Sequence, residues 1–368
     1  MGRRVYLIAL VALVAVAGAA VYVATRTDPS SVGGTHTVAA ASDLPVLADD
    51  VPSLDGNKGW LDSPPLSASD LLGKVVIYDF WTYSCVNCVR TIPHLQALYA
   101  AYHPLGLEII GIHSPEFDFE KDHGNVQRAI GELGVTWPVL LDDDMNVWKS
   151  FGNQYWPAEY LADQKGQVRS VHFGEGDYSQ KEDEVRALLN VPASTPRVDT
   201  AAAGATPTAQ QTPEIHLGTD FGAELYSAVS PYASGTTTFA APADQQSNTF
   251  ALDGPWTVDT QAATAASDTS TLALRYQAGE VNVVLGLSGV PSGSSGTPVG
   301  VVVTLDGQPV PEANRPPGMV LDATGDTVVP VAAHDLFRLV TGGPSGFHTL
   351  TLAPQAQGVQ AYAFTFGT

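Results

Sequence analysis

The feature that most constrains this sequence is a pair of cysteines, Cys85 and Cys88, between an apolar run and a helical pattern. The run from Lys74 to Phe80 is rich in β-branched and apolar residues, which is typical of a buried strand. A helix is expected to begin near Cys85 and to extend to about Tyr102. Three-residue spacing in a first helical turn brings two sulfur atoms together, and the helix N-terminus favours a thiolate on the first. The pair therefore predicts a redox-active dithiol, with Cys85 as nucleophile and Cys88 as resolving thiol.

Two other roles are open to these cysteines. A purely structural disulfide is not favoured, because a bridge that closes so small a loop constrains the unfolded chain little. Half of a zinc site is not favoured either, because the sequence has no other cysteine and its nearest histidine is His94. We therefore expect no metal and no other cofactor.

An acid within the predicted strand is a candidate partner of the dithiol. Asp79 lies among the apolar residues Ile77, Tyr78 and Phe80, six positions before Cys85. A carboxyl group in that setting is desolvated, its pKa is raised, and it suits proton exchange with Cys88. The alternative is an aspartate at a strand end that faces solvent.

Patterns along the chain divide it into five parts. Strand and helix patterns alternate over 51–190, which predicts an α/β domain; Ser179 with Glu182 resembles a capping box that opens its last helix. Residues 191–213 are rich in Pro, Ala and Thr and are expected to be an interdomain linker, or else a long loop. Short apolar runs separated by turn residues over 214–368 predict an antiparallel β-sandwich.

The N-terminus carries an export signal. An apolar run covers residues 5–24, long enough to span a bilayer, and Arg3 and Arg4 precede it. We expect 1–26 to be an uncleaved signal anchor or a cleaved signal peptide, followed by a spacer over 27–50. Both alternatives place the bulk of the chain outside the cytoplasm. Acids outnumber bases 38 to 17, for a net charge of −21, which argues against a nucleic-acid partner.

The cysteine motif and its surroundings resemble a known family. The run Trp-Thr-Tyr-Ser-Cys-Val-Asn-Cys-Val-Arg-Thr-Ile-Pro over 81–93 is similar to the thioredoxin-like domain of TlpA, ResA and DipZ-type proteins. The similarity continues through 109–117, 137–142, 151–161 and 172–176, and covers about residues 55–190. The resemblance implies a thioredoxin-like fold. It also implies that Pro157 is the cis-proline facing the nucleophilic cysteine and that Asp79 is the family's buried acid.

Several positions depart from thioredoxin itself. Val86-Asn87 stands between the cysteines where thioredoxin has Gly-Pro, which leaves the redox potential open. Glu159 lies two residues past Pro157, on the same side of its strand, and is a candidate second acid near Asp79 and Cys88; the alternatives are an exposed glutamate or an ion pair. His113 and Glu116 end the strand predicted over 107–113, and we expect His113 to be structural.

The C-terminal part resembles the tail of DipZ-type proteins through Trp256, the run Leu-Asp-Gly over 305–307 and the run over 362–367. The resemblance implies a jelly-roll domain of the carbohydrate-binding-module kind. The pattern around Trp256 nevertheless alternates like a core-directed strand, which favours protein docking or a spacer over sugar binding. DipZ-type proteins also carry a multi-span CcdA-like electron-transfer domain. This sequence shows only one apolar run, so the expected donor is a separate membrane protein of CcdA type.

Together these features predict an extracytoplasmic, membrane-tethered thiol-disulfide oxidoreductase that reduces or isomerises disulfides in exported proteins. One alternative is a thiol oxidant that uses the same residues. A thiol peroxidase is a weaker alternative, because Tyr78 stands where a proline is expected ahead of the Thr82-x-x-Cys85 pattern. A glycan-binding surface protein with a thioredoxin-like scaffold is the alternative from another class.

Overall fold

A six-stranded mixed sheet organises the first half of the chain. The computed structural model describes residues 44–198, 211–220, 225–226, 231–290 and 295–367. Hydrogen bonds join the strands in the order β1-β4-β3-β2-β5-β6, with β2, β3 and β4 parallel and the other pairings antiparallel. The strands are β1 (Trp60–Leu61), β2 (Val75–Trp81), β3 (Leu107–His113), β4 (Val139–Leu141), β5 (Ala158–Ala162) and β6 (Val168–Phe173). We call residues 44–198 the α/β region; the predicted α/β fold is confirmed.

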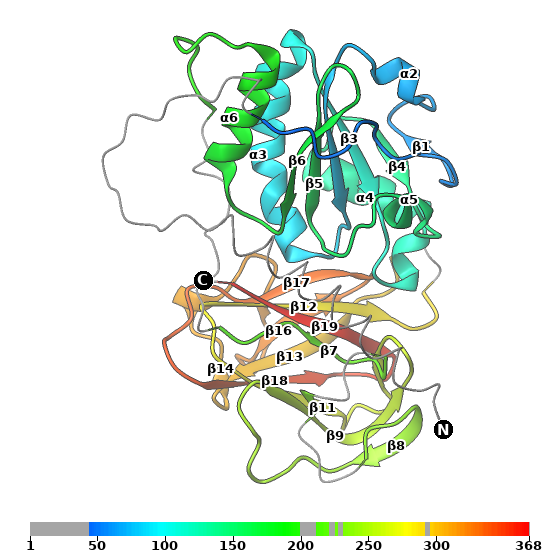
Figure 1. Ribbon diagram of the computed structural model, residues 1–368. Coiled ribbons are helices and arrows are strands. Elements are labelled where there is room, and N and C mark those ends of the chain that lie inside the picture. The colour runs from blue at the N-terminus through cyan, green and yellow to red at the C-terminus, as the bar shows by residue number, and fades with distance from the viewer. Residues whose placement is uncertain (1–43, 199–210, 221–224, 227–230, 291–294, 368) are drawn as a thin grey trace, which may run out of the picture. The chain divides into compact units, whose positions relative to one another are not determined.

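Helices cover both faces of this sheet (Figure 1). The helices α3 (Val86–Tyr102), α4 (His123–Leu133) and α6 (Tyr178–Leu189) share one hydrophobic cluster with Ile77, Ile109 and Leu161. The short helices α2 (Ala68–Leu71) and α5 (Asn146–Ser150) pack with Tyr78 and Ile110 on the other face. Because successive strand residues point to opposite faces, the odd-numbered residues of β2 and β5 face α3 and α6. The 3₁₀ turns η2 (His103–Leu105) and η3 (Asp118–Lys121) follow α3 and β3.

The start of α6 differs from the prediction. The helix begins at Tyr178 with Asp177 as its N-cap, so the expected capping box opened by Ser179 is wrong. Asp177 has a φ of 51° and its side chain makes no capping hydrogen bond. Glu182 is buried instead, and its carboxylate accepts hydrogen bonds from the Tyr102 hydroxyl (2.6 Å) and from the Val198 backbone amide (3.0 Å).

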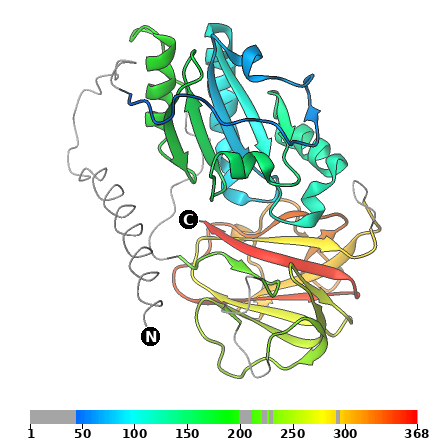
Figure 2. The ribbon, with the colours of Figure 1, turned by 45° about the vertical axis from the view of Figure 1, so that its right-hand side comes forward.

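The second half of the chain is all β, as predicted (Figures 1 and 2). Its 13 strands form one connected sheet with antiparallel pairings, in which β19 lies beside β12. The strands are β7 (Ile215–His216), β8 (Gly235–Phe239), β9 (Thr249–Val258), β10 (Ala263–Ala265), β11 (Thr271–Tyr276), β12 (Glu280–Leu287), β13 (Val299–Leu305), β14 (Gln308–Pro309), β15 (Val320–Leu321), β16 (Thr327–Val331), β17 (Asp335–Val340), β18 (His348–Pro354) and β19 (Val359–Gly367), with the 3₁₀ turn η5 (Glu312–Asn314) between β14 and β15. We call residues 211–367 the β region.

Strand β9 joins two parts of this sheet. Residues 249–253 pair with β11, and residues 254–258 pair with β10 and β8. Gly254, at the change of partner, has a φ of +80°, and a Cβ there would lie 2.9 Å from the Thr269 carbonyl oxygen. Only glycine fits this position without strain.

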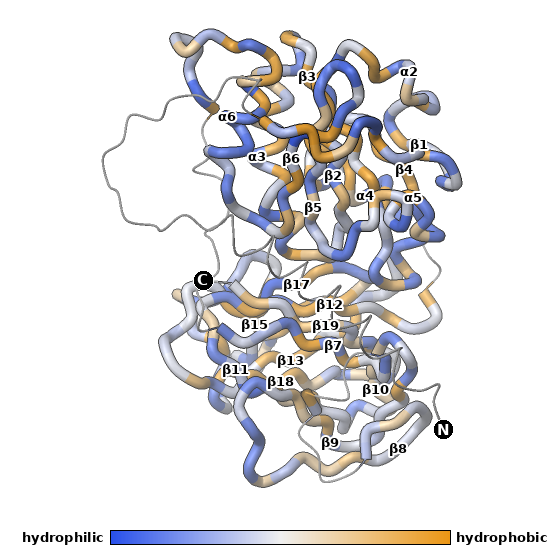
Figure 3. Tube along the Cα trace, in the orientation of Figure 1, coloured by the Kyte–Doolittle hydropathy of each residue, from blue (hydrophilic) through white to orange (hydrophobic). Residues whose placement is uncertain are grey.

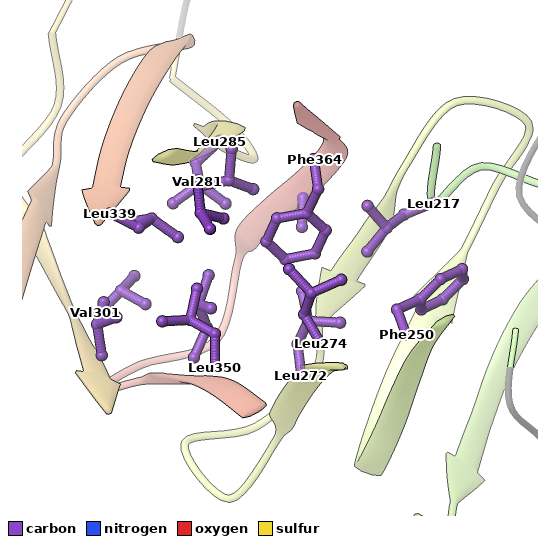
Figure 4. Packing of buried hydrophobic residues seen from close by; sticks show 14 of the residues in the cluster. Leu217, Phe250, Leu272, Leu274, Val281, Leu285, Val301, Leu339, Leu350 and Phe364 are labelled. Atoms are coloured by element: carbon purple, nitrogen blue, oxygen red, sulfur yellow. The ribbon is translucent and has the colours of Figure 1, made fainter. Parts of the chain in front are cut away.

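Side chains from both parts of the sheet meet in one core (Figure 4). Val301 and Leu350 come from one part, and Val281 and Phe364 from the other. Trp256 is 1 % exposed within this core, so its predicted burial is confirmed. Figure 3 shows hydrophobic residues on the central strands and hydrophilic residues on the connecting loops, as a buried sheet requires.

The α/β region and the β region are in direct contact and belong to one compact unit. Tyr362 of β19 packs against Phe117 and Phe119, with ring centroids 5.1 and 4.8 Å apart. Arg128 of α4 forms an ion pair of 3.1 Å with Asp335 of β17.

Within the described ranges, no helix is long and apolar enough to cross a membrane. The apolar run over 5–24, on which the expected anchor or signal peptide rests, lies outside the described residues.

Candidate active site

The two cysteines lie at the N-terminus of α3. Cys85 is the N-cap residue, with an extended backbone, and its Sγ accepts a hydrogen bond of 3.3 Å from the Cys88 backbone amide. Both cysteines are free thiols; Cys85 is half-buried, and Cys88 has no exposed surface. The expected asymmetry between an accessible first sulfur and a buried second one is therefore present.

Burial has the largest effect on the pKa of the second thiol, Cys88. It raises the pKa of Cys88 well above the ordinary range of a thiol, and the hydrogen bond and charge of Cys85 raise it further. The carboxyl group of Asp79 contributes in the same direction. Cys88 therefore holds its proton until a base takes it.

Asp79 lies at the centre of the sheet, facing α3. It is 2 % exposed, so the alternative of a solvent-facing aspartate is wrong. Burial raises the pKa of Asp79 well above its usual range, and the nearby charge of Glu159 raises it again. Its Oδ1 has no hydrogen-bond partner in the described part of the chain. This carboxyl group therefore holds its proton to a higher pH than an exposed aspartate does.

Glu159 lies directly across the strand pair from Asp79, because the two residues are register partners on β5 and β2. It is 4 % exposed and forms an ion pair of 2.7 Å with the Nζ of Lys181 on α6. Burial opposes ionisation of Glu159, but the Lys181 ammonium lowers its pKa below the usual value. Two of the expected arrangements hold at once, a second acid beside Asp79 and an ion pair, whereas an exposed glutamate is wrong.

Lys181 is a residue that the sequence did not single out. It is 3 % exposed, although it stands in the polar run Gln-Lys-Glu-Asp-Glu, which reads as a solvated helix face. His94 of α3 completes the buried cluster at 1 % exposure, with its ring centroid 4.7 Å from that of Tyr178. Burial lowers the pKa of His94 to about 4, so its imidazole is neutral at pH 7.

Pro157 follows a cis peptide bond from Trp156, as the resemblance implied. The Trp156 indole donates a hydrogen bond of 2.9 Å from Nε1 to the Ser114 carbonyl oxygen, which fixes the loop ahead of β5. Trp156 and Cys85 line the same cavity, so the chain just before Pro157 borders Cys85.

His113 and Glu116 have different surroundings. His113 is fully buried, its Nε2 lies 3.3 Å from the Thr82 hydroxyl oxygen, and burial lowers its pKa to about 3, which fits the expected structural role. Glu116 borders the cavity at Cys85, where its Oε1 lies 2.6 Å from Nε2 of His216 on β7. Sequence reasoning gave no sign of His216 at this place.

Another buried acid, Glu120, lies next to the cysteine motif. Glu120 accepts hydrogen bonds from the Ser84 hydroxyl (2.5 Å) and from the backbone amides of Glu116 (2.6 Å) and Phe117 (3.0 Å). Burial, followed by the charge of Glu116, raises the pKa of Glu120 to about 7. This carboxyl group holds the loop ahead of Cys85.

Asp142, the first residue of the acidic run over 142–144, has a structural role. Asp142 accepts hydrogen bonds from the amides of Val147 (2.9 Å) and Trp148 (2.8 Å) at the start of α5. A different group, Glu116 with Glu214 and His216, has ligand atoms within 4.8 Å of one another, as a metal site requires. The hydrogen bond between Glu116 and His216 already accounts for this grouping.

Comparisons with known proteins agree with the two halves of the fold. Residues 47–171 match the AhpC/TSA family, and residues 212–367 match the family described as thioredoxin like C-terminal domain. The protein DipZ of Mycobacterium tuberculosis is 42% identical over 250 residues, which cover 65% of this chain and 35% of DipZ. The chain thus spans about a third of the length of that relative.

Two shorter relatives are matched over most of their length. The thiol-disulfide oxidoreductase YkuV of Bacillus subtilis is 30% identical over 144 residues, which cover 39% of this chain and 96% of YkuV. The thiol-disulfide oxidoreductase ResA of Halalkalibacterium halodurans is 30% identical over 129 residues, which cover 35% of this chain and 70% of ResA. With the dithiol in place at the start of α3, the chain belongs to the thioredoxin-like family of thiol-disulfide oxidoreductases.

Proposed function

We propose that this protein reduces or isomerises disulfides in exported proteins by thiol-disulfide exchange at Cys85 and Cys88. The thiolate of Cys85 attacks one sulfur of the substrate disulfide, and the other sulfur leaves as a thiolate that takes a proton from water. Cys88 then attacks the Cys85 sulfur of the mixed disulfide. The second substrate thiol leaves, the enzyme pair is oxidised to a disulfide, and the substrate gains two electrons.

The observation that carries this proposal is the different setting of the two sulfur atoms. Cys85 is half-buried and receives the Cys88 amide at 3.3 Å, at the positive end of α3. A backbone donor and a helix N-terminus stabilise a thiolate at that position. Cys88 has no exposed surface, so a protein substrate reaches only Cys85.

The buried acids support the second step. The Cys88 thiol must lose its proton before it attacks, and Asp79 is the base that faces it from β2. Glu159, held ionised by Lys181, keeps negative charge next to Asp79 and so makes Asp79 a stronger base. Pro157 follows the loop that borders Cys85, where an incoming polypeptide would lie.

We also propose the place of the reaction. Residues 1–26 would serve as a signal anchor, or as a signal peptide, and 27–50 as a spacer that holds the domain over 51–190 outside the membrane. A membrane protein of CcdA type would return electrons to the oxidised pair. The linker would cover 191–213, and 214–368 would form a β-sandwich domain. Trp256 is buried, so the β region lacks the exposed tryptophan that would favour sugar binding.

Trapping tests the exchange. Cys88→Ala should hold exported proteins in mixed disulfides on Cys85, because no second thiol resolves them, and Cys85→Ala is the matched control that should trap none. Equal trapping by both variants would contradict the assigned roles. The measured potential then fixes direction: a value near about −270 mV indicates a reductant, and one near about −120 mV a thiol oxidant.

A further inference from the structure

A cavity opens beside Cys85, and both regions of the chain build its walls. Its volume is about 320 Å³. The α/β region supplies Cys85, Glu116 and the loop residues Tyr155 and Trp156, among others. The β region supplies Glu214, His216 and Thr365. The nucleophilic sulfur therefore lies in a site that is incomplete without the β region.

The walls of this cavity are acidic. No lysine or arginine is among its lining residues. The His216 imidazole is paired with Glu116 at 2.6 Å, and its ligand atom lies within 4.8 Å of that of Glu214 as well, so one imidazole faces two carboxyl groups. The ligand atoms of Glu116 and Glu214 lie within 4.8 Å of each other, and burial together with the charge of Glu116 raises the pKa of Glu214 to about 7. Because His216 can compensate only one of these two carboxylates, the group favours one further positive charge.

A second cavity continues the first. Its volume is about 160 Å³, and it shares Asn87, Glu214 and Thr365 with the cavity at Cys85. The segment from Gln211 to Pro213 and Phe366 form its other walls. Arg90 donates to the Phe366 carbonyl oxygen, but its guanidinium is already paired with Glu175 (3.3 Å) and Glu280 (3.0 Å). The two cavities share walls and form one groove beside the sulfur, and among its described lining residues the one basic side chain is His216, which is paired with Glu116.

We propose that this groove binds an extended segment of the substrate protein in which a lysine or arginine lies beside the reacting cysteine, with Glu214 receiving the positive charge. The inference rests on the proposed function and adds a substrate class to it. An extended chain fits a groove of this size, whereas a folded surface does not enter it. The β region thus acts as a specificity element for the exchange at Cys85.

Short peptide disulfides test this preference. The probes are three homodimers of a blocked tetrapeptide that differ only next to the cysteine, with lysine, glutamine or glutamate. The rate at which each peptide disulfide oxidises the reduced protein is divided by the rate at which the same peptide reacts with dithiothreitol. This ratio corrects for differences in the intrinsic reactivity of the peptides. A unit charge about 5 Å from Glu214 changes the rate roughly fourfold in water, so we expect the lysine probe to react at least tenfold faster than the glutamate probe. Added salt should reduce this ratio.

Two variants separate the groove from the overall charge. Glu214→Gln should reduce the lysine-to-glutamate ratio to within about threefold of one. Glu312→Gln removes the same charge from an exposed turn of the β region outside both cavities, and should leave the ratio unchanged. An equal fall in both variants, or a ratio near one in the parent, would overturn the inference while leaving the exchange reaction intact. Failure of the parent to react with any of the probes would instead overturn the proposed function.

Discussion

Replacing Lys181 with methionine tests the buried charge cluster directly. Lys181 and Glu159 are 3 % and 4 % exposed and form an ion pair of 2.7 Å. Methionine keeps most of the side-chain length but leaves the Glu159 carboxylate buried without a cation. Breaking a buried pair in this way costs about 3–5 kcal/mol of folding free energy if the carboxylate stays ionised.

Protonation of Glu159 gives the variant a second option, and its cost depends on pH. The pKa of a glutamate in the unfolded chain is about 4.3. Keeping Glu159 protonated in the folded protein therefore costs about 1 kcal/mol of folding free energy at pH 5 and about 5 kcal/mol at pH 8. The folded protein adopts the cheaper form at each pH. We therefore expect Lys181→Met to lose about 1 kcal/mol at pH 5 and about 3–5 kcal/mol at pH 8.

The direction in which stability changes with pH distinguishes the Lys181→Met variant from the parent. In the parent, the pKa of Glu159 is lowered, so its contribution is present above the unfolded pKa and is lost only as pH falls through the folded value. In the variant, burial without a cation raises the folded pKa, so stability is present below the unfolded pKa and is lost as pH rises. Parent and variant should therefore diverge between pH 5 and pH 8.

Urea unfolding of the reduced full-length protein at both pH values measures this divergence. The double variant Lys181→Met/Glu159→Gln removes both charges and should show no added pH dependence. A loss of the same size at pH 5 and pH 8 in the single variant would refute the reasoning, because it would show that Lys181 contributes packing and not charge compensation.

Three further variants probe other parts of the structure. Asp79→Asn should prolong the mixed disulfide on Cys85 on the order of a hundredfold with little change in the first attack, seen by quenched-flow mass spectrometry; equal lifetimes from pH 6 to pH 9 would exclude Asp79 as the base. The folded pKa of Glu120 is about 7, so the protein should lose roughly 3–4 kcal/mol of stability as pH rises from the unfolded pKa of this residue through 7, and Glu120→Gln should remove that slope in urea unfolding. Trp256→Ala should destabilise the β region by about 3–5 kcal/mol in thermal or urea unfolding, and a loss below about 1 kcal/mol would contradict its place in the core.

The core of the site was predictable because it is local in sequence. A β-branched run followed by two cysteines fixes strand, turn and helix start, and these order the sulfur atoms along α3. The register of β2 and β5 places Asp79 and Glu159 on the face that carries α3, since residues directly opposite each other on neighbouring strands point to the same side of the sheet. The role of Pro157 came from the resemblance alone, because a Trp-Pro pair by itself permits either isomer.

The rest of the site was not predictable, because it depends on contacts between distant parts of the chain. Lys181 stands in a run of charged residues that has no apolar period, and only the packing of α6 on the sheet buries it. Ser179 shows the same limit, since its pattern satisfied the capping rule while Asp177 took the N-cap position. Glu214 and His216 are more than 120 residues from Cys85, and nothing in their local pattern connects them to it.

The two sulfur atoms depend on different parts of the molecule. Cys85 faces a cavity whose acidic wall comes partly from the β region. We therefore expect this wall to influence which substrate forms the mixed disulfide. Cys88 has no exposed surface, and we propose that its proton passes inward to Asp79. Burial and the negative charge of Glu159 raise the pKa of Asp79, and the positive charge of Lys181 lowers it. Changes at Glu214 should therefore alter the choice of substrate without altering resolution, whereas changes at Glu159 should alter the rate of resolution for every substrate alike.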